Sequence, residues 1–133
     1  MMYLVDTNIW LELLLEQEKE EEVRRFFQSV EARLLSISDF SLYSIGIILT
    51  KLKKDDVFID FISDTIEDSG VMRICLSSID LKQVIQVRQR YPLDFDDCYQ
   101  YIAAKKYSYI IVSFDSDFDR TELGRKTPKE VMF

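Results

Sequence analysis

Short runs of apolar residues alternate along the chain with longer amphipathic stretches. The runs with the length and composition of buried strands are residues 2–5, 34–37, 71–76 and 109–113. The stretches with helical spacing of apolar positions are residues 9–15, 17–30, 38–52, 57–66, 78–91 and 93–106. Strands too apolar to face water, separated by helices, are typical of a parallel sheet covered on both faces. The pattern therefore predicts an α/β fold.

Local signals mark where several of these elements begin and end. Ser38 and Asp39 form a predicted capping pair, because short side chains with an oxygen atom accept the free N–H groups of a first helical turn. Residues 68–70, with the sequence Asp-Ser-Gly, are a turn signal. Pro92 is expected to end the helix that Ser78 opens, because proline lacks the N–H group that continues a helix.

The length and composition fit one domain. The chain has 133 residues, of which 47% are hydrophobic and 31% charged, with three glycines and two prolines. This balance favours dense regular structure over linkers or disorder, and we expect residues 1–133 to form a single domain. No apolar run reaches the roughly 20 residues that cross a bilayer, and no basic region precedes the first apolar stretch. We therefore expect a cytoplasmic protein with no membrane contact.

Charge and reactive residues exclude several classes of function. The net charge of −7 disfavours a general nucleic-acid coat protein, because neutralising phosphates requires a basic face. The chain has no histidine, which removes the usual neutral-pH general base and every Ser-His or Cys-His nucleophile. Cys75 and Cys98 lack metal-site spacing, so we expect two small core residues. Any chemistry must come from carboxylates, lysine, tyrosine or a metal ion.

Aspartates follow the first and the last predicted strand. Others begin the helix that precedes the last strand. Asp6 follows the first strand, Asp115 and Asp117 follow the last, and Asp96 and Asp97 begin the preceding helix. The carboxyl ends of parallel strands meet at one edge of a sheet, where open α/β folds place their functional crevice. Helix capping explains each aspartate singly, but carboxylates gathered on one rim repel one another unless cations offset the charge. Because Mg²⁺ prefers oxygen ligands, the pattern predicts a divalent-metal site.

Three motifs around these aspartates resemble those of PIN-domain ribonucleases, especially the VapC-type toxins. They are Asp6-Thr7-Asn8, Phe95-Asp96-Asp97-Cys98 and Val112-Ser113-Phe114-Asp115-Ser116-Asp117-Phe118. The order and spacing fit, and the resemblance covers essentially the whole chain. It implies a three-layer α/β/α sandwich with a Rossmann-like parallel central sheet. It also implies that the chain cleaves single-stranded RNA with Mg²⁺ or Mn²⁺, pairs with a small antitoxin protein and forms a homodimer.

The resemblance also assigns roles by position. It implies that Asp6, Asp97 and Asp115 are the catalytic metal ligands and that Asp117 is an accessory ligand. Two further residues, Asn8 and Ser113, are implied to support the ligands through hydrogen bonds.

One position departs from the family pattern. The family usually places a glutamate in the helix after the second strand, in a pattern like S-x-x-x-x-x-E-L, and Ser44 stands there in this chain. A serine hydroxyl is neutral and a poorer ligand for a hard cation than a carboxylate. Asp39, Asp96 and Glu12 are the candidates for supplying the missing charge. A second hypothesis therefore stays open: a degenerate PIN domain, catalytically weak or inactive, that binds RNA or protein.

Two other α/β classes fit the motifs less well. A haloacid-dehalogenase-type phosphatase requires D-x-D after its first strand, and Asn8 occupies the second acidic position, where an amide cannot deliver a proton. A response-regulator receiver requires a central phosphoacceptor aspartate and a late lysine after a strand, of which only scattered pieces are present. The metal-dependent ribonuclease remains the favoured hypothesis.

Overall fold

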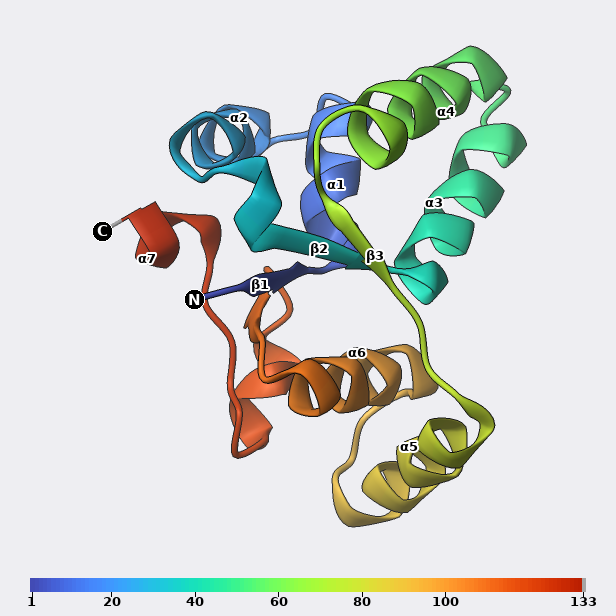
Figure 1. Ribbon diagram of the computed structural model, residues 1–133, viewed down its shortest axis with the longest axis vertical. Helices are drawn as coiled ribbons and strands as arrows, with labels where there is room; N and C mark the ends of the chain where they lie inside the picture. Colours follow the sequence, from blue (N-terminus) through green and yellow to red (C-terminus); the bar gives the residue numbers. More distant parts are fainter. Residues whose placement is uncertain (133) are drawn as a thin grey trace.

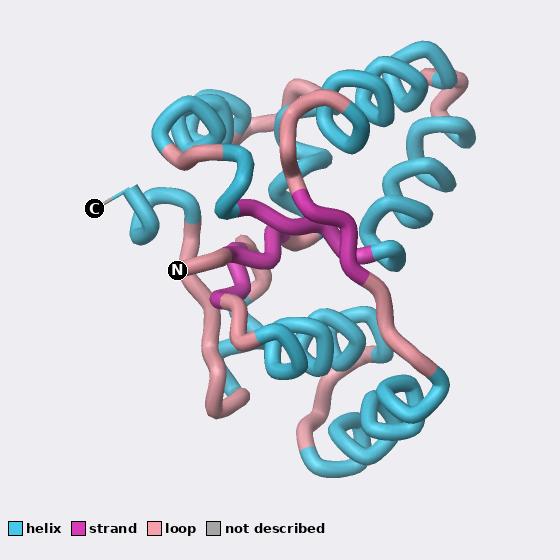
Figure 2. Tube along the Cα trace, in the orientation of Figure 1, coloured by secondary structure: helices cyan, strands magenta, loops and turns pink. Residues whose placement is uncertain are grey.

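Four short parallel strands form the central sheet of the computed structural model, which describes residues 1–132 (Figures 1 and 2). The strands are β1 (Tyr3–Val5), β2 (Leu35–Ser38), β3 (Met72–Ile74) and β4 (Ile110–Val112). Their order across the sheet is β3-β2-β1-β4, and all three strand pairs are parallel. The sheet therefore confirms the parallel arrangement that the apolar strands predicted.

Helices cover both faces of this sheet. They are α1 (Thr7–Leu14), α2 (Glu20–Ser29), α3 (Asp39–Lys51), α4 (Asp55–Phe61), α5 (Ser78–Arg90), α6 (Phe95–Tyr107) and α7 (Pro128–Met132). Shorter segments are the 3₁₀ helices η1 (Ala32–Leu34) and η3 (Ser116–Arg120) and the π-helix η2 (Ile62–Glu67). Figure 1 shows α1 to α4 on one side of the sheet and α5 and α6 on the other, which confirms the three-layer α/β/α architecture. Within residues 1–132, no helix has the length and apolar composition needed to cross a bilayer.

The two faces of the sheet pack into separate cores because successive residues of a strand point in opposite directions. Val5 packs with Ile9 and Trp10 in the core below α1, whereas the preceding Leu4 packs with Ala103 of α6 on the other face. Leu4 and Val5 are both fully buried. Burial on both faces is the reason that β1 and β4 consist of apolar residues.

The start of α3 differs from the predicted capping pair. The Ser38 hydroxyl accepts a hydrogen bond from the backbone N–H of Ser41 at 3.1 Å, so Ser38 caps the helix as predicted. Asp39 does not share this role, because its carboxylate forms an ion pair with the guanidinium of Arg73 on β3. That half of the prediction was wrong, and the reason is a partner from a neighbouring strand.

Two other features were not predicted correctly. Cys98 is buried as expected, but Cys75 is exposed because it lies just beyond β3, in the segment that leads to α5. The sequence patterns did not predict η3 or α7, which are short and lack the repeated apolar spacing of the longer helices. The predicted helix end before Pro92 is confirmed, because α5 ends at Arg90.

Candidate metal centre

Carboxylates from three elements meet at the carboxyl edge of the sheet. Asp6 follows β1, Asp115 follows β4, and Asp97 lies in the first turn of α6. Together with Asp96 they line a cavity of about 170 Å³. The remaining lining residues are Thr7, Asn8, Leu11 and Phe40. The structure thus brings the acids of all three motifs to one place, as the positions at the strand ends suggested.

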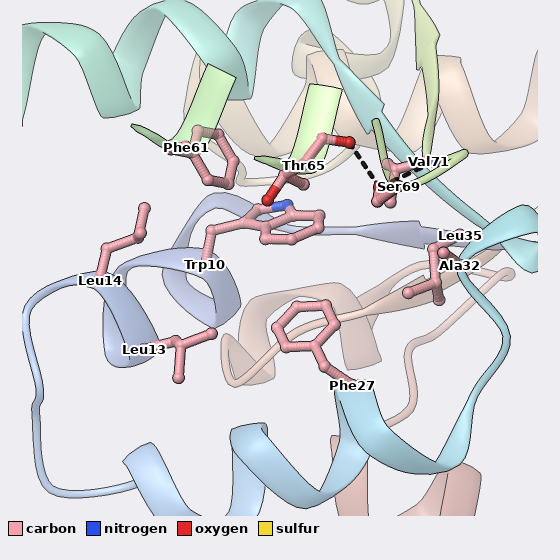
Figure 3. A pocket seen from close by; sticks show the side chains of 10 residues that line it. All are labelled: Trp10, Leu13, Leu14, Phe27, Ala32, Leu35, Phe61, Thr65, Ser69 and Val71. Atoms are coloured by element: carbon pink, nitrogen blue, oxygen red, sulfur yellow. Dashed lines mark hydrogen bonds between the residues drawn. The ribbon is translucent and has the colours of Figure 1, made fainter. Parts of the chain in front are cut away.

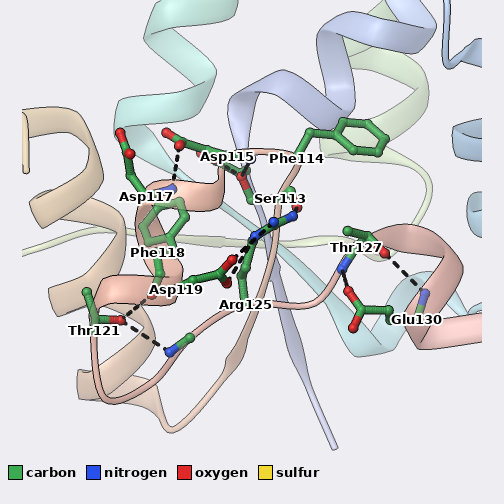
Figure 4. Close-up of polar contacts among 12 residues, drawn as sticks. Ser113, Phe114, Asp115, Asp117, Phe118, Asp119, Thr121, Arg125, Thr127 and Glu130 are labelled. Atoms are coloured by element: carbon green, nitrogen blue, oxygen red, sulfur yellow. Dashed lines mark hydrogen bonds and ion pairs between the residues drawn. The ribbon is translucent and has the colours of Figure 1, made fainter.

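A compact set of possible metal ligands overlaps this cavity. Asp97, Asp115 and Asp117 each offer one carboxylate oxygen, and these oxygens lie within 4.8 Å of one another. Figure 4 shows the carboxylates of Asp115 and Asp117 pointing to the same side of their loop, while the ring of Phe114 points away. Ligand distances to Mg²⁺ or Ca²⁺ are about 2.0–2.6 Å, so oxygens separated by this much can share one ion.

Asp6 is held rigidly at the edge of the cavity. Its side chain is 8% exposed, and its Oδ1 accepts hydrogen bonds from the backbone N–H of Thr7 at 2.9 Å and from Nε2 of Gln100 at 3.0 Å. The hydroxyl of Ser113 donates to Oδ2 at 2.6 Å. Burial raises the pKa of Asp6 above its ordinary value, and the hydrogen bonds from Ser113 and Gln100 only partly oppose this effect. Asp6 therefore caps α1 and faces the cavity at the same time.

Asp97 is a second buried acid of the cavity, and it has other carboxylates beside it. It is 7% exposed, and burial together with the negative charges of Asp115 and Asp96 raises its pKa to about 8. A carboxyl with this pKa keeps its proton at neutral pH unless a positive charge approaches. Raised carboxyl pKa values within a cavity are typical of functional sites.

Ser113 and Asn8 tie the ends of β4 and β1 together. The Ser113 hydroxyl donates to Asp6 and accepts hydrogen bonds from Nδ2 of Asn8 at 3.2 Å and from the backbone N–H of Asp115 at 2.9 Å. Asn8 Oδ1 in turn accepts from the backbone N–H of Phe114 at 3.2 Å. The two side chains therefore form hydrogen bonds to Asp6 and to the backbone of Phe114 and Asp115.

Several predicted residues lie away from the cavity lining. Ser44 is half-buried on α3 and does not line the cavity, although Phe40, one turn earlier, does. Asp39 is engaged in its ion pair, and Oε2 of Glu12 accepts a backbone hydrogen bond at 2.9 Å. Of the three acids considered for the missing charge, Asp96 is the one that lines the cavity.

Gln100 is a residue of this site that the sequence patterns did not identify. It is 1% exposed, lies on α6 and contacts Asp6 directly. Its position three residues after Asp97 places both on one side of the helix. A polar side chain at this spacing, within an otherwise apolar stretch, is the signal that could have revealed it.

A second cavity of about 230 Å³ lies on the far side of α1 and has a different character (Figure 3). The side chains that line it are Trp10, Leu13, Leu14, Phe27, Ala32, Leu35, Phe61, Thr65, Ser69 and Val71. None of them is charged, and Trp10 stacks on Phe27 with ring centroids 4.7 Å apart. This cavity belongs to the apolar core and lacks the acids of the candidate metal centre.

Comparisons with known proteins cover most of the chain. The family model described as the PIN domain matches residues 3–123. No match was found among curated proteins.

Solved structures with similar folds come from several bacteria. A toxin-antitoxin complex from Klebsiella pneumoniae has a TM-score of 0.75 at 17% identity, covering 95% of this chain and 97% of that chain. FitAcB from Neisseria gonorrhoeae has a TM-score of 0.75 at 19% identity, covering 96% and 99%. VapC20 from Mycobacterium tuberculosis, described as a sarcin-ricin loop cleaving toxin, has a TM-score of 0.79 at 16% identity, covering 91% and 95%. At these identities the likeness establishes the fold.

Proposed function

The chain belongs to the PIN-domain family, and from this premise we propose that it is a metal-dependent endoribonuclease that cleaves RNA phosphodiester bonds. The observation that carries the proposal is the group of ligand oxygens from Asp97, Asp115 and Asp117, which lie within 4.8 Å of one another beside the buried Asp6. A chain with a net charge of −7 accepts a polyanion at such a group only when cations neutralise the acids.

The donor set fits the expected metal. Every candidate ligand is a carboxylate, and hard cations such as Mg²⁺ and Mn²⁺ prefer oxygen ligands. We assign Asp97 and Asp115 to hold the ion together with Asp6, which lines the same cavity but lies outside the group of close oxygens, and Asp117 as an accessory ligand. A divalent ion bound there would supply a Lewis acid that polarises the phosphodiester and activates a water molecule.

The chain's own residues orient the acids and hold a proton. Ser113 fixes Oδ2 of Asp6 and the backbone of Asp115 through hydrogen bonds, and Asn8 holds Ser113 in place. Asp97 keeps a proton at neutral pH until a cation arrives, because its pKa is about 8. We further propose that Asp96, exposed at the cavity, supplies the charge that Ser44 lacks.

A protein partner and self-association are part of the proposal. One fold neighbour is a toxin-antitoxin complex, and we propose that this chain likewise pairs with a small antitoxin protein. The test is whether a small protein, encoded by a gene next to the gene for this chain, inhibits its RNA cleavage at a one-to-one ratio. We also propose a homodimer, for which light scattering after gel filtration should give twice the chain mass of 15.8 kDa.

The main experiment is cleavage of a labelled single-stranded RNA during titration with Mn²⁺ and Mg²⁺. Wild type is compared with Asp6→Asn, which keeps the size of the side chain but removes its charge. Asp64→Asn, at an exposed aspartate of η2, is the matched control because it lies outside the cavity lining. We expect cleavage that depends on the metal, is lost in Asp6→Asn and is retained in Asp64→Asn. Equal cleavage by Asp6→Asn and wild type would refute the assigned site.

Ser44 favours a second candidate function, a degenerate PIN domain that binds RNA or protein without cleaving RNA. The same assay separates the two candidates through Ser44→Glu, which places a carboxylate at the position of the family's glutamate. Cleavage that appears only in Ser44→Glu would support the degenerate domain. Cleavage by wild type would reject it.

A further inference from the structure

A buried amide links the candidate metal centre to α3. Gln100 is 1% exposed, and both ends of its side-chain amide have partners. Nε2 donates to Oδ1 of Asp6 at 3.0 Å and to the hydroxyl of Ser41 at 2.8 Å, which uses both of its N–H groups. Oε1 accepts from the hydroxyl of Ser38 at 2.8 Å. The amide is thus hydrogen-bonded in full at a buried position, where an unpaired polar group is costly.

These contacts are compatible with only one orientation of the Gln100 side-chain amide. Exchanging its oxygen and nitrogen would place Oε1 against the carboxylate of Asp6, where two acceptors repel each other. The hydroxyl of Ser38 already accepts from the backbone N–H of Ser41, so its own proton is free for Oε1. Ser41 is held in turn by the hydroxyl of Thr7, which donates to it at 2.8 Å. The network therefore sets the direction of the Gln100 N–H groups.

The consequence for Asp6 is that its two oxygens differ. Oδ1 accepts from Thr7 and Gln100, whereas Oδ2 accepts from the hydroxyl of Ser113. A carboxylate oxygen has about two acceptor positions, so Oδ1 is filled and Oδ2 retains one. We infer that Gln100 is a positioning residue that occupies Oδ1 of Asp6 and directs Oδ2 towards the metal. This inference rests on the proposed metal-dependent function.

The network also gives α3 a role that does not need a carboxylate at position 44. Ser38 and Ser41 belong to the cap and first turn of α3, and both bind Gln100. Helix α3 therefore helps to orient Asp6 from the end that borders the cavity. Its hydroxyl groups hold the amide of Gln100, and this amide binds Asp6. Residues that hold a metal ligand in this way change metal affinity or activity by about 10- to 100-fold when they are mutated.

The test uses two apolar replacements of Gln100. Gln100→Leu fills similar space without an amide, and Gln100→Met is an unbranched replacement of similar length. Gln86→Leu, at an exposed glutamine of α5, is the matched control. Dissociation constants for Mn²⁺ are measured by electron paramagnetic resonance without RNA, and kcat and KM are then measured for a labelled RNA at saturating Mn²⁺.

We expect both Gln100 variants to bind Mn²⁺ about tenfold more weakly, with a lower kcat and an unchanged KM for RNA, while Gln86→Leu matches wild type. A folded Gln100 variant with wild-type Mn²⁺ affinity and kcat would overturn the inference and leave the nuclease proposal standing. Weakened Mn²⁺ binding in the variants, with no RNA cleavage by wild type, would support the inference and refute the nuclease proposal.

If neither variant folds, a measurement on the wild-type protein tests the inference about Gln100. Nuclear magnetic resonance follows the side-chain NH₂ signals of Gln100 during titration with Mg²⁺. The inference requires these signals to shift as the metal binds, because the amide contacts a ligand. Signals that stay unchanged at saturating Mg²⁺ would overturn it.

Discussion

Lowering the pH from 8 to 6 is expected to weaken Mn²⁺ binding by about 50-fold. Burial and the charges of Asp115 and Asp96 raise the pKa of Asp97 to about 8, so its carboxyl is half ionised at pH 8 and about 1% ionised at pH 6. Metal binding requires the ionised ligand and releases the proton. The ratio of the two ionised fractions gives the factor of about 50, which corresponds to about 2 kcal/mol of binding free energy.

Isothermal titration calorimetry at pH 6, 7 and 8 measures both the affinity and the protons released. Repeating each titration in buffers with different ionisation enthalpies should show more protons released per Mn²⁺ at pH 6 than at pH 8. Asp97→Asn should bind weakly throughout and show a smaller pH dependence than wild type, whereas the control Asp64→Asn should retain the full dependence. Equal wild-type dissociation constants at pH 6 and pH 8 would refute the reasoning.

Three further predictions concern the free energy of unfolding. Without metal, the free energy of unfolding should fall as the pH rises from about 4 to about 8, because native Asp97 keeps a proton that the unfolded chain releases near pH 3.8. Urea unfolding in the presence of a chelator measures this free energy. A rise in the free energy of unfolding across this pH range would contradict the prediction. Ser113→Ala should lower the free energy of unfolding by about 1–3 kcal/mol, because three hydrogen bonds at a buried site lose their shared hydroxyl, and urea unfolding of the metal-free protein should show the loss. Trp10→Ala should lower it by about 3–5 kcal/mol, because the ring is 3% exposed and packs on Phe27 and Phe61; an effect below about 1 kcal/mol in the same urea assay would contradict this.

The sequence predicted the parts of the fold that depend on local pattern. Alternation of apolar strands and amphipathic helices was enough for the covered parallel sheet, because burial on both faces leaves a direct mark on composition. Asp6 and Asp115 converge because parallel strands end at the same edge, and Asp97 joins them because α6, the helix that leads into β4, begins at that edge. The order of the strands was not predicted, because pairing between distant segments leaves no local pattern.

The parts of the site that escaped prediction depend on tertiary contacts. Asp39 looked like a cap, but its partner Arg73 lies 34 residues away on a neighbouring strand. Gln100 meets Asp6 across 94 residues of sequence, and this contact depends on how α6 is rotated against β1. Neither contact can be predicted from helical spacing alone.

The central claim is that Asp6, Asp97 and Asp115 hold a divalent metal, and crystallography with Mn²⁺ tests it most directly. Crystals grown with saturating Mn²⁺ near pH 8 should show an anomalous difference peak within about 2.5 Å of carboxylate oxygens of Asp97 and Asp115, on the side that Oδ2 of Asp6 faces. Crystals of Asp6→Asn under the same conditions should show a weaker peak. Absence of any anomalous peak between these carboxylates in wild type would contradict the account.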